Sequence, residues 1–118
     1  MKKTFISLVS LVATLMFLSL GYAAPADGPY TGEIMDSQCA LLGGHAKMMT
    51  KGESAKDCTM RCVGIGGKYI LFDAAKKTRY QLDDQKKAEM FAGAKVTVTG
   101  SFDPATKTIK VDTIKPAA

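Results

Sequence analysis

Apolar and polar residues alternate along much of the chain after residue 29, and this pattern predicts five β-strands. The clearest strand covers residues 94–102, where Val96 and Val98 face one side while Thr97 and Thr99 face the other. The other four strands are expected at residues 30–35, 68–72, 78–82 and 107–114.

Two short helices are predicted between these strands. Ser54 is a suitable N-cap, and Asp57 three residues later supports a helix over residues 55–63, ended by glycines. Asp83 or Asp84 can cap a second short helix before the fourth strand.

The order of these elements predicts a mainly β fold. Five strands with a short helix between strands 3 and 4 match a small OB-like Greek-key barrel. An antiparallel sheet with one packed helix is the alternative. A Cys-rich helical insertion at residues 36–67 follows strand 1. We therefore expect a single OB-like domain over residues 30–118, after a flexible leader at residues 24–29.

The first residues have the pattern of a secretory signal peptide. Lys2 and Lys3 precede an uncharged apolar stretch over residues 5–20, and small residues occupy positions 21 and 23. An uncleaved membrane anchor is the alternative, but the stretch is shorter than the roughly 18–20 residues of a spanning helix. We expect cleavage after residue 23, a mature chain that does not span the membrane, and a periplasmic or secreted bacterial protein.

Charge and composition exclude several functions. Loss of the two leader lysines lowers the net charge from +5 to +3, and the remaining charges of both signs are scattered. Nucleic acid is therefore not an expected partner. The chain has a single histidine and no Cys-x-x-Cys motif, so neither a Ser-His-Asp hydrolase nor a thioredoxin-type dithiol is indicated. No catalytic constellation is found, and we expect a non-enzymatic protein.

All three cysteines and the only histidine lie within residues 39–62. They are Cys39, His45, Cys58 and Cys62. On the predicted helix the last two cysteines are one turn apart, so their thiols share a face. Three sulfurs and one imidazole suit one tetrahedral zinc ion with a structural role, or a copper ion in a carrier or buffer.

Nearby residues extend this predicted metal site. Met48 and Met49 are candidate auxiliary soft ligands. Asp36 is expected either to order the loop before Cys39 or to hydrogen-bond to a metal ligand.

Oxidation of the cysteines leads to different functions. A disulfide from Cys39 to Cys58 or Cys62 would leave no metal, and the chain would then be a disulfide-stapled periplasmic domain that binds a protein or envelope ligand. Because three is an odd number, one thiol would remain free. A third alternative is a thiol redox protein that uses this free cysteine.

Several motifs resemble those of small exported bacterial proteins of unknown function. They are Asp-Ser-x-Cys-Ala at residues 36–40, Gly-His-Ala-x-Met at residues 44–48, and Cys-x3-Cys at residues 58–62. The resemblance covers nearly all of the mature chain and implies that these motifs act together, without implying an activity. The C-terminal half also resembles exported bacterial OB-fold proteins, which lack the cysteine insertion.

Overall fold

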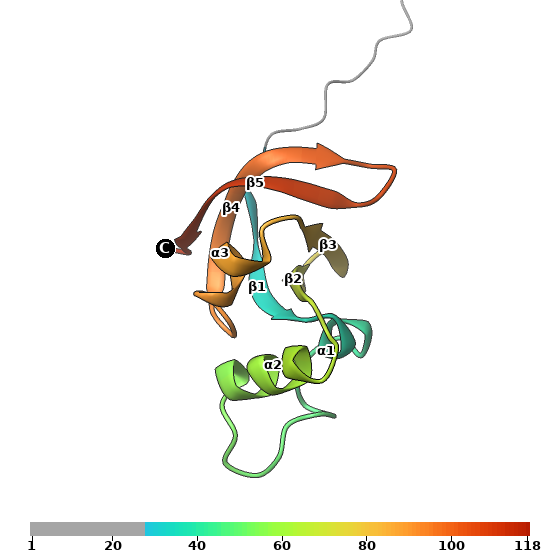
Figure 1. Cartoon of the computed structure of the whole chain (residues 1–118), viewed down its shortest axis with the longest axis vertical. Coiled ribbons are helices and arrows are strands. Elements are labelled where there is room, and N and C mark those ends of the chain that lie inside the picture. The colour runs from blue at the N-terminus through green and yellow to red at the C-terminus, as the bar shows by residue number, and fades with distance from the viewer. Residues whose placement is uncertain (1–27) are drawn as a thin grey trace, which may run out of the picture.

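A computed structural model describes residues 28–118, so the predicted signal peptide and most of the leader lie outside the described residues. Five strands form a closed barrel in the order β1-β2-β3-β5-β4 (Figure 1). Their bounds are β1 Tyr30–Asp36, β2 Tyr69–Asp73, β3 Thr78–Leu82, β4 Lys95–Asp103 and β5 Thr108–Pro116. The predicted OB-like barrel is confirmed. No helix within residues 28–118 is long and apolar enough to span a membrane.

Strand β1 closes the barrel by pairing with two neighbours. Its first half pairs with β4, where Tyr30 lies opposite Val98, and its second half pairs with β2, where Ile34 lies opposite Leu71. The strands β3 and β5 complete the ring through a parallel pair. The end of β1 therefore leads directly from the barrel wall into the insertion.

Three short helices connect the strands. They are α1 Ser37–Leu41, α2 Ala55–Gly64 and α3 Gln85–Glu89. The predicted N-caps Ser54 and Asp84 accept hydrogen bonds from backbone N–H groups at the starts of α2 and α3. The helix α1 was not predicted, so Cys39 lies on a helix where a loop was expected. Its side-chain cap from Asp36 explains why five residues suffice to form a turn there.

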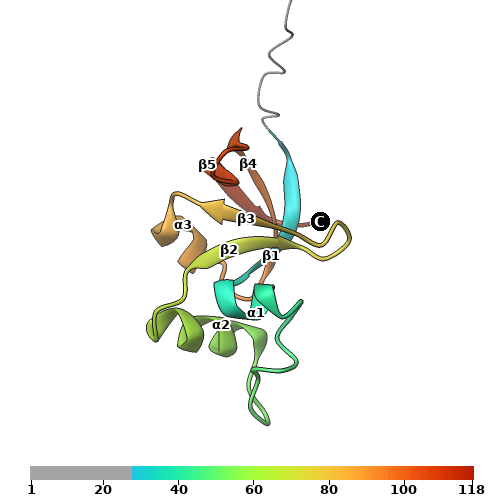
Figure 2. The same cartoon turned by 90° about the vertical axis from the view of Figure 1, so that its right-hand side faces the viewer.

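The two faces of β1 and β2 contact different cores. Ile34 and Leu71 point into the barrel, in the main core. Met35 and Ile70 point the other way, into a second core with all three cysteines. Both side views place α1 and α2 together below the barrel, against β1 and β2 (Figures 1 and 2). The insertion thus has its own small core, built on the outer face of the barrel.

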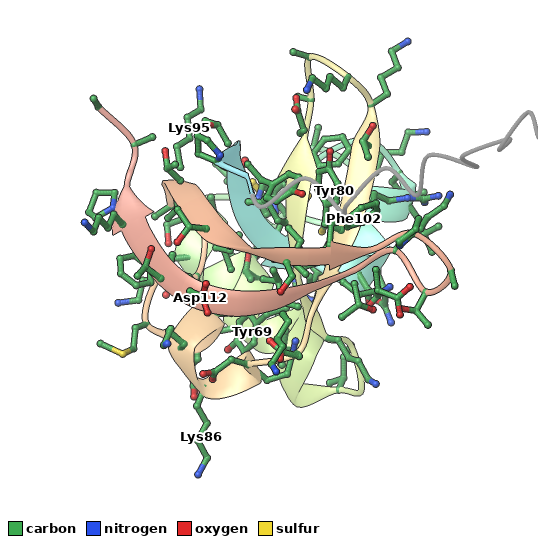
Figure 3. The ribbon with its side chains drawn as sticks, turned by 90° about the horizontal axis from the view of Figure 1, so that it is seen from above. Tyr69, Tyr80, Lys86, Lys95, Phe102 and Asp112 are labelled. Atoms are coloured by element: carbon green, nitrogen blue, oxygen red, sulfur yellow. The ribbon has the colours of Figure 1, made fainter. Side chains whose placement is uncertain are left out.

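Aromatic rings pack at the other end of the barrel. Tyr80 lies 5.2 Å from Tyr30 and 5.6 Å from Phe102 between ring centroids, and the view from above shows Tyr80 beside Phe102 (Figure 3). Tyr80 is only 9% exposed. These rings therefore contribute to packing rather than to an open stacking surface.

Gly93 fixes the distance between the barrel and α2. Its φ is +74°, and a Cβ at this position would lie 2.4 Å from the backbone nitrogen of Lys56. We expect Gly93→Ala to destabilise the fold by about 2–4 kcal/mol, because the left-handed conformation and the backbone clash both oppose a side chain.

The matched control for this change is Gly52→Ala. Gly52 has a similar φ of +81° and no atom within 4 Å of an added Cβ, so it reports the conformational cost alone, about 1–2 kcal/mol. Urea unfolding of both variants measures the difference. Equal losses would contradict the role of the close approach to Lys56.

Candidate metal centre

Asp36 positions the first cysteine. It is the last residue of β1, and its Oδ2 accepts hydrogen bonds from the backbone N–H groups of Gln38 at 3.0 Å and Cys39 at 2.9 Å. This cap starts α1 and holds Cys39 fully buried. The expectation that Asp36 orders this segment through side-chain-to-backbone hydrogen bonds is therefore met.

The helix α2 supplies the other two thiols. Cys58 and Cys62 are separated by one helical turn, and both are fully buried. Arg61 on the same helix donates to Glu53 at 2.8 Å and to the carbonyl oxygen of Met48 at 2.8 Å. These bonds tie the loop between α1 and α2 to the helix that carries the cysteines.

The predicted ligands fall into two overlapping groups. Donor atoms of Cys39, His45 and Cys58 lie within 4.8 Å of one another. Donor atoms of Asp36, Cys39 and Cys62 form a second group with the same limit. The fold thus brings the thiols and the imidazole into one cluster that could hold a metal ion, with Asp36 as an additional donor.

The sulfur geometry matches coordination spacing. The Sγ atoms of Cys39 and Cys58 are 3.9 Å apart, and two thiolates on one tetrahedral zinc ion are about 3.8 Å apart when each Zn–S bond is about 2.3 Å. A disulfide requires a separation near 2.05 Å. All three cysteines are free thiols in this structure.

Glu33 holds the imidazole, and sequence reasoning missed this residue. The Nε2 atom of His45 lies 2.7 Å from Oε1 of Glu33, whereas the buried Nδ1 atom has no hydrogen-bond partner. A proton on Nε2, shared with the carboxylate, leaves the lone pair of Nδ1 available to a metal. The only sequence signal was that Glu33 alternates onto the same face of β1 as Met35.

We expect Glu33→Ala to weaken metal binding by about 10–100-fold, because the carboxylate orients the His45 ring and fixes the proton on Nε2. Glu33→Gln should restore part of this loss, since an amide oxygen also accepts from Nε2–H. The exposed Glu89 provides the control Glu89→Ala, which should bind like the unmodified protein. Competition with a chromophoric chelator measures the affinities. Equal affinity in Glu33→Ala and Glu89→Ala would refute this role.

The thiols of Cys39 and Cys62 favour their protonated form when no metal is present. Burial raises the pKa of Cys39, and the negative charge of the neighbouring Asp36 raises it further. Burial also raises the pKa of Cys62, with a smaller contribution from the charge of Asp36. A metal ion must therefore displace these protons when it binds.

This direction of shift predicts that the metal-free protein is less stable at alkaline pH. Thiols whose pKa is raised in the folded state stabilise it fully below their ordinary pKa of about 8.5, and this contribution is lost as the pH rises further. Urea unfolding of chelator-treated protein between pH 7 and pH 10 should show the decline. Cys62→Ser should show a shallower decline, and an identical slope would contradict this assignment.

The candidate auxiliary methionines lie in different environments. Met48 is partly buried against the core that contains the cysteines, whereas Met49 is 37% exposed. Neither belongs to the two donor groups, which were evaluated for histidine, cysteine and carboxylate atoms only.

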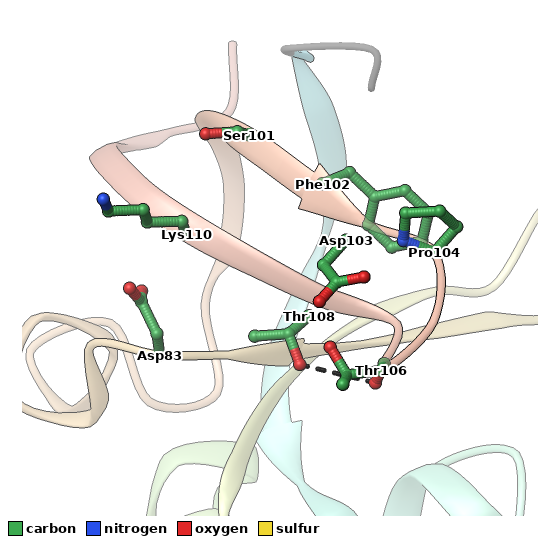
Figure 4. A pocket seen from close by; sticks show the side chains of 8 residues that line it. All are labelled: Asp83, Ser101, Phe102, Asp103, Pro104, Thr106, Thr108 and Lys110. Atoms are coloured by element: carbon green, nitrogen blue, oxygen red, sulfur yellow. Dashed lines mark hydrogen bonds between the residues drawn. The ribbon is translucent and has the colours of Figure 1, made fainter. Parts of the chain in front are cut away.

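A hollow of about 530 Å³ lies beside the β4–β5 turn, at the other end of the molecule (Figure 4). Phe102 forms one wall, and Lys110 and Asp83 flank the opposite side. Asp83 Oδ1 accepts from the N–H of Val111 at 2.8 Å. The residues that line this hollow include no thiol or imidazole, and the thiols and the imidazole of the described residues lie around α1 and α2.

The comparison with known proteins covers most of the barrel strands and leaves out the donor cluster. Residues 63–117 match a family described as a protein of unknown function (DUF5818). No curated protein and no solved structure gives a significant match. The family match includes β2 to β5 and excludes every member of the donor cluster. Over just under half of its length, the chain is therefore similar to a family whose description names no activity.

Proposed function

We propose that this protein is a small exported module without enzymatic activity, and that its Cys39, His45, Cys58 and Cys62 cluster binds metal. Zinc is the ion that we favour, as a structural staple between the insertion and the barrel. The observation that carries the proposal is the buried Nδ1 of His45, which has no hydrogen-bond partner and belongs to a histidine grouped with two free thiols.

Metal coordination would satisfy this nitrogen. A buried polar atom without a partner costs about 1–3 kcal/mol, and protein structures keep few of them. His45 has a side chain only 10% exposed, so water has little access to its ring. A cation at the centre of this group would be coordinated by the lone pair of Nδ1 and by the sulfur atoms of Cys39 and Cys58.

The location of the cluster supports a structural role. Cys39 comes from α1, and Cys58 and Cys62 come from α2, while the imidazole is held by Glu33 of β1. One ion would thus join three elements that are separated along the sequence. The insertion has only a small apolar core of its own, and small units of this kind commonly depend on a metal or a crosslink.

Burial favours a staple over a carrier that exchanges its ion readily. All three thiols are 0% exposed, and closed sites with protein ligands are typical of structural zinc. The predicted signal peptide supports export to the periplasm or the medium. In that compartment a bound ion would also protect three adjacent thiols from oxidation.

Native mass spectrometry of protein isolated from the periplasm tests the proposal. Zinc on a chain whose thiols remain intact is the expected result. A metal-free chain that is lighter by two hydrogens would instead identify the disulfide-stapled domain, and a copper mass would identify a copper-binding module.

His45→Ala tests the site itself and should sharply weaken zinc binding. The exposed neighbour Lys47 provides a control in the same loop, because Lys47→Ala removes a side chain outside the donor groups. Equal zinc affinity in the two variants would refute the assignment of His45 as a ligand.

A further inference from the structure

Asp36 contains a second buried atom that the fold leaves unsatisfied. The residue is 0% exposed. Its Oδ2 caps α1, but its Oδ1 has no hydrogen-bond partner. An ionised carboxylate is expensive to bury unless it is paired or coordinates a metal. The helix cap therefore explains one oxygen of Asp36 and leaves the other unexplained.

Each donor group contains two cysteines and one further residue with a buried atom that lacks a hydrogen-bond partner. One contains Cys39, Cys58 and His45, whose Nδ1 lacks a partner, and the other contains Cys39, Cys62 and Asp36, whose Oδ1 lacks a partner. They share only the thiol of Cys39. A single ion placed within one group would leave the unsatisfied atom of the other group buried and unpaired.

The negative charge of the donor residues also favours more than one bound ion. Three thiolates and one carboxylate carry a charge of −4 when all four are ionised, and a single divalent ion would leave −2 in a site with fully buried thiols. Two divalent ions would neutralise these four groups. Buried charge without compensation is strongly unfavourable, so two ions account better for this donor set than one.

We infer that the cluster holds two divalent ions that share the thiolate of Cys39. The first ion is bound by Cys39, His45 and Cys58, and the second by Asp36, Cys39 and Cys62. This inference rests on the proposed function and extends it to the number and class of the ions. The carboxylate of Asp36 is a hard oxygen donor, which suits zinc and not a cuprous ion.

Zinc stoichiometry tests this inference directly. The full chain is loaded with Zn²⁺ alone, excess ion is removed, and the bound ions are counted by native mass spectrometry. We expect two zinc ions on the unmodified protein and one on Asp36→Asn. Asparagine can still cap α1 through its side-chain oxygen, so this variant loses the charged metal donor and keeps the helix start.

The controls separate a second site from a folding defect and from surface binding. Asp112→Asn changes an exposed aspartate and should retain two ions. Cys62→Ser and His45→Ala should each retain one ion, because each removes a donor from only one group. Retention of the first ion by Asp36→Asn, together with an unchanged circular dichroism spectrum, shows that the variant is folded.

Two results would overturn the inference. One is a single zinc ion on the unmodified protein. The other is a second ion that persists in both Asp36→Asn and Cys62→Ser. In either case the proposed function survives if His45→Ala still weakens zinc binding. A protein that binds no zinc at all would overturn the proposed function as well.

Discussion

Chelation of zinc from the loaded protein is expected to lower its melting temperature by about 15–30 °C. A ligand present at 1,000 times its dissociation constant stabilises the folded state by about 4 kcal/mol. In a domain of this size each kcal/mol changes the melting temperature by about 4–8 °C. The loss should begin in α1, α2 and the loop between them, since the insertion has only a small apolar core.

Thermal unfolding followed by circular dichroism, with and without a strong chelator, measures this effect. Hydrogen exchange should show faster exchange in α1 and α2 than in the barrel strands after chelation. The control is Cys39→Ser, whose melting temperature should not respond to the chelator. A similar response in both proteins would show that the chelator acts on something other than the cluster.

Cys39→Ser is expected to reduce zinc affinity by at least about 1,000-fold, equivalent to about 4 kcal/mol. Cys39 is the only donor that belongs to both groups, so its loss damages every arrangement of ions that the cluster allows. A serine hydroxyl is a poor replacement because it does not ionise at neutral pH and is a much weaker zinc ligand.

Cys62→Ser is the matched comparison, since it makes the same chemical change at an equally buried position. It leaves the group of Cys39, His45 and Cys58 intact and should retain tight binding of one ion. Competition titrations with a chromophoric chelator give both affinities. If the two serine variants lose the same affinity, Cys39 does not have the shared position that the structure indicates.

Much of the barrel could be predicted because its strands follow local rules. Val96 and Val98 alternate with threonines in β4, and both valines are fully buried in the main core. The start of α2 was likewise readable from Ser54, whose side chain accepts from the N–H of Asp57 at 3.1 Å. Such features depend on residues within a few positions of one another, so the local sequence contains the information.

The site was only partly predictable, because its chemistry depends on distant residues. The pairing of Glu33 with His45 spans 12 positions and requires the loop after α1 to return to β1. The sequence also did not reveal that Asp36 belongs to a donor group, because an aspartate at this position is equally well explained as ordering the loop before Cys39 or as hydrogen-bonding to a metal ligand. Only the unpartnered Oδ1, together with the neighbouring thiols, indicates a further role.

The sequence by itself determined the order of the strands, the capped helix that carries two thiols one turn apart, and the confinement of all cysteines and the single histidine to one segment. These properties follow from residue periodicity and spacing, which need no knowledge of the fold. Only the tertiary structure decided which donors meet. Closure of the barrel through β1 places the outer faces of β1 and β2 against both insertion helices. That packing divides the cluster into two groups around Cys39, because distances between separate elements are set by the core between them.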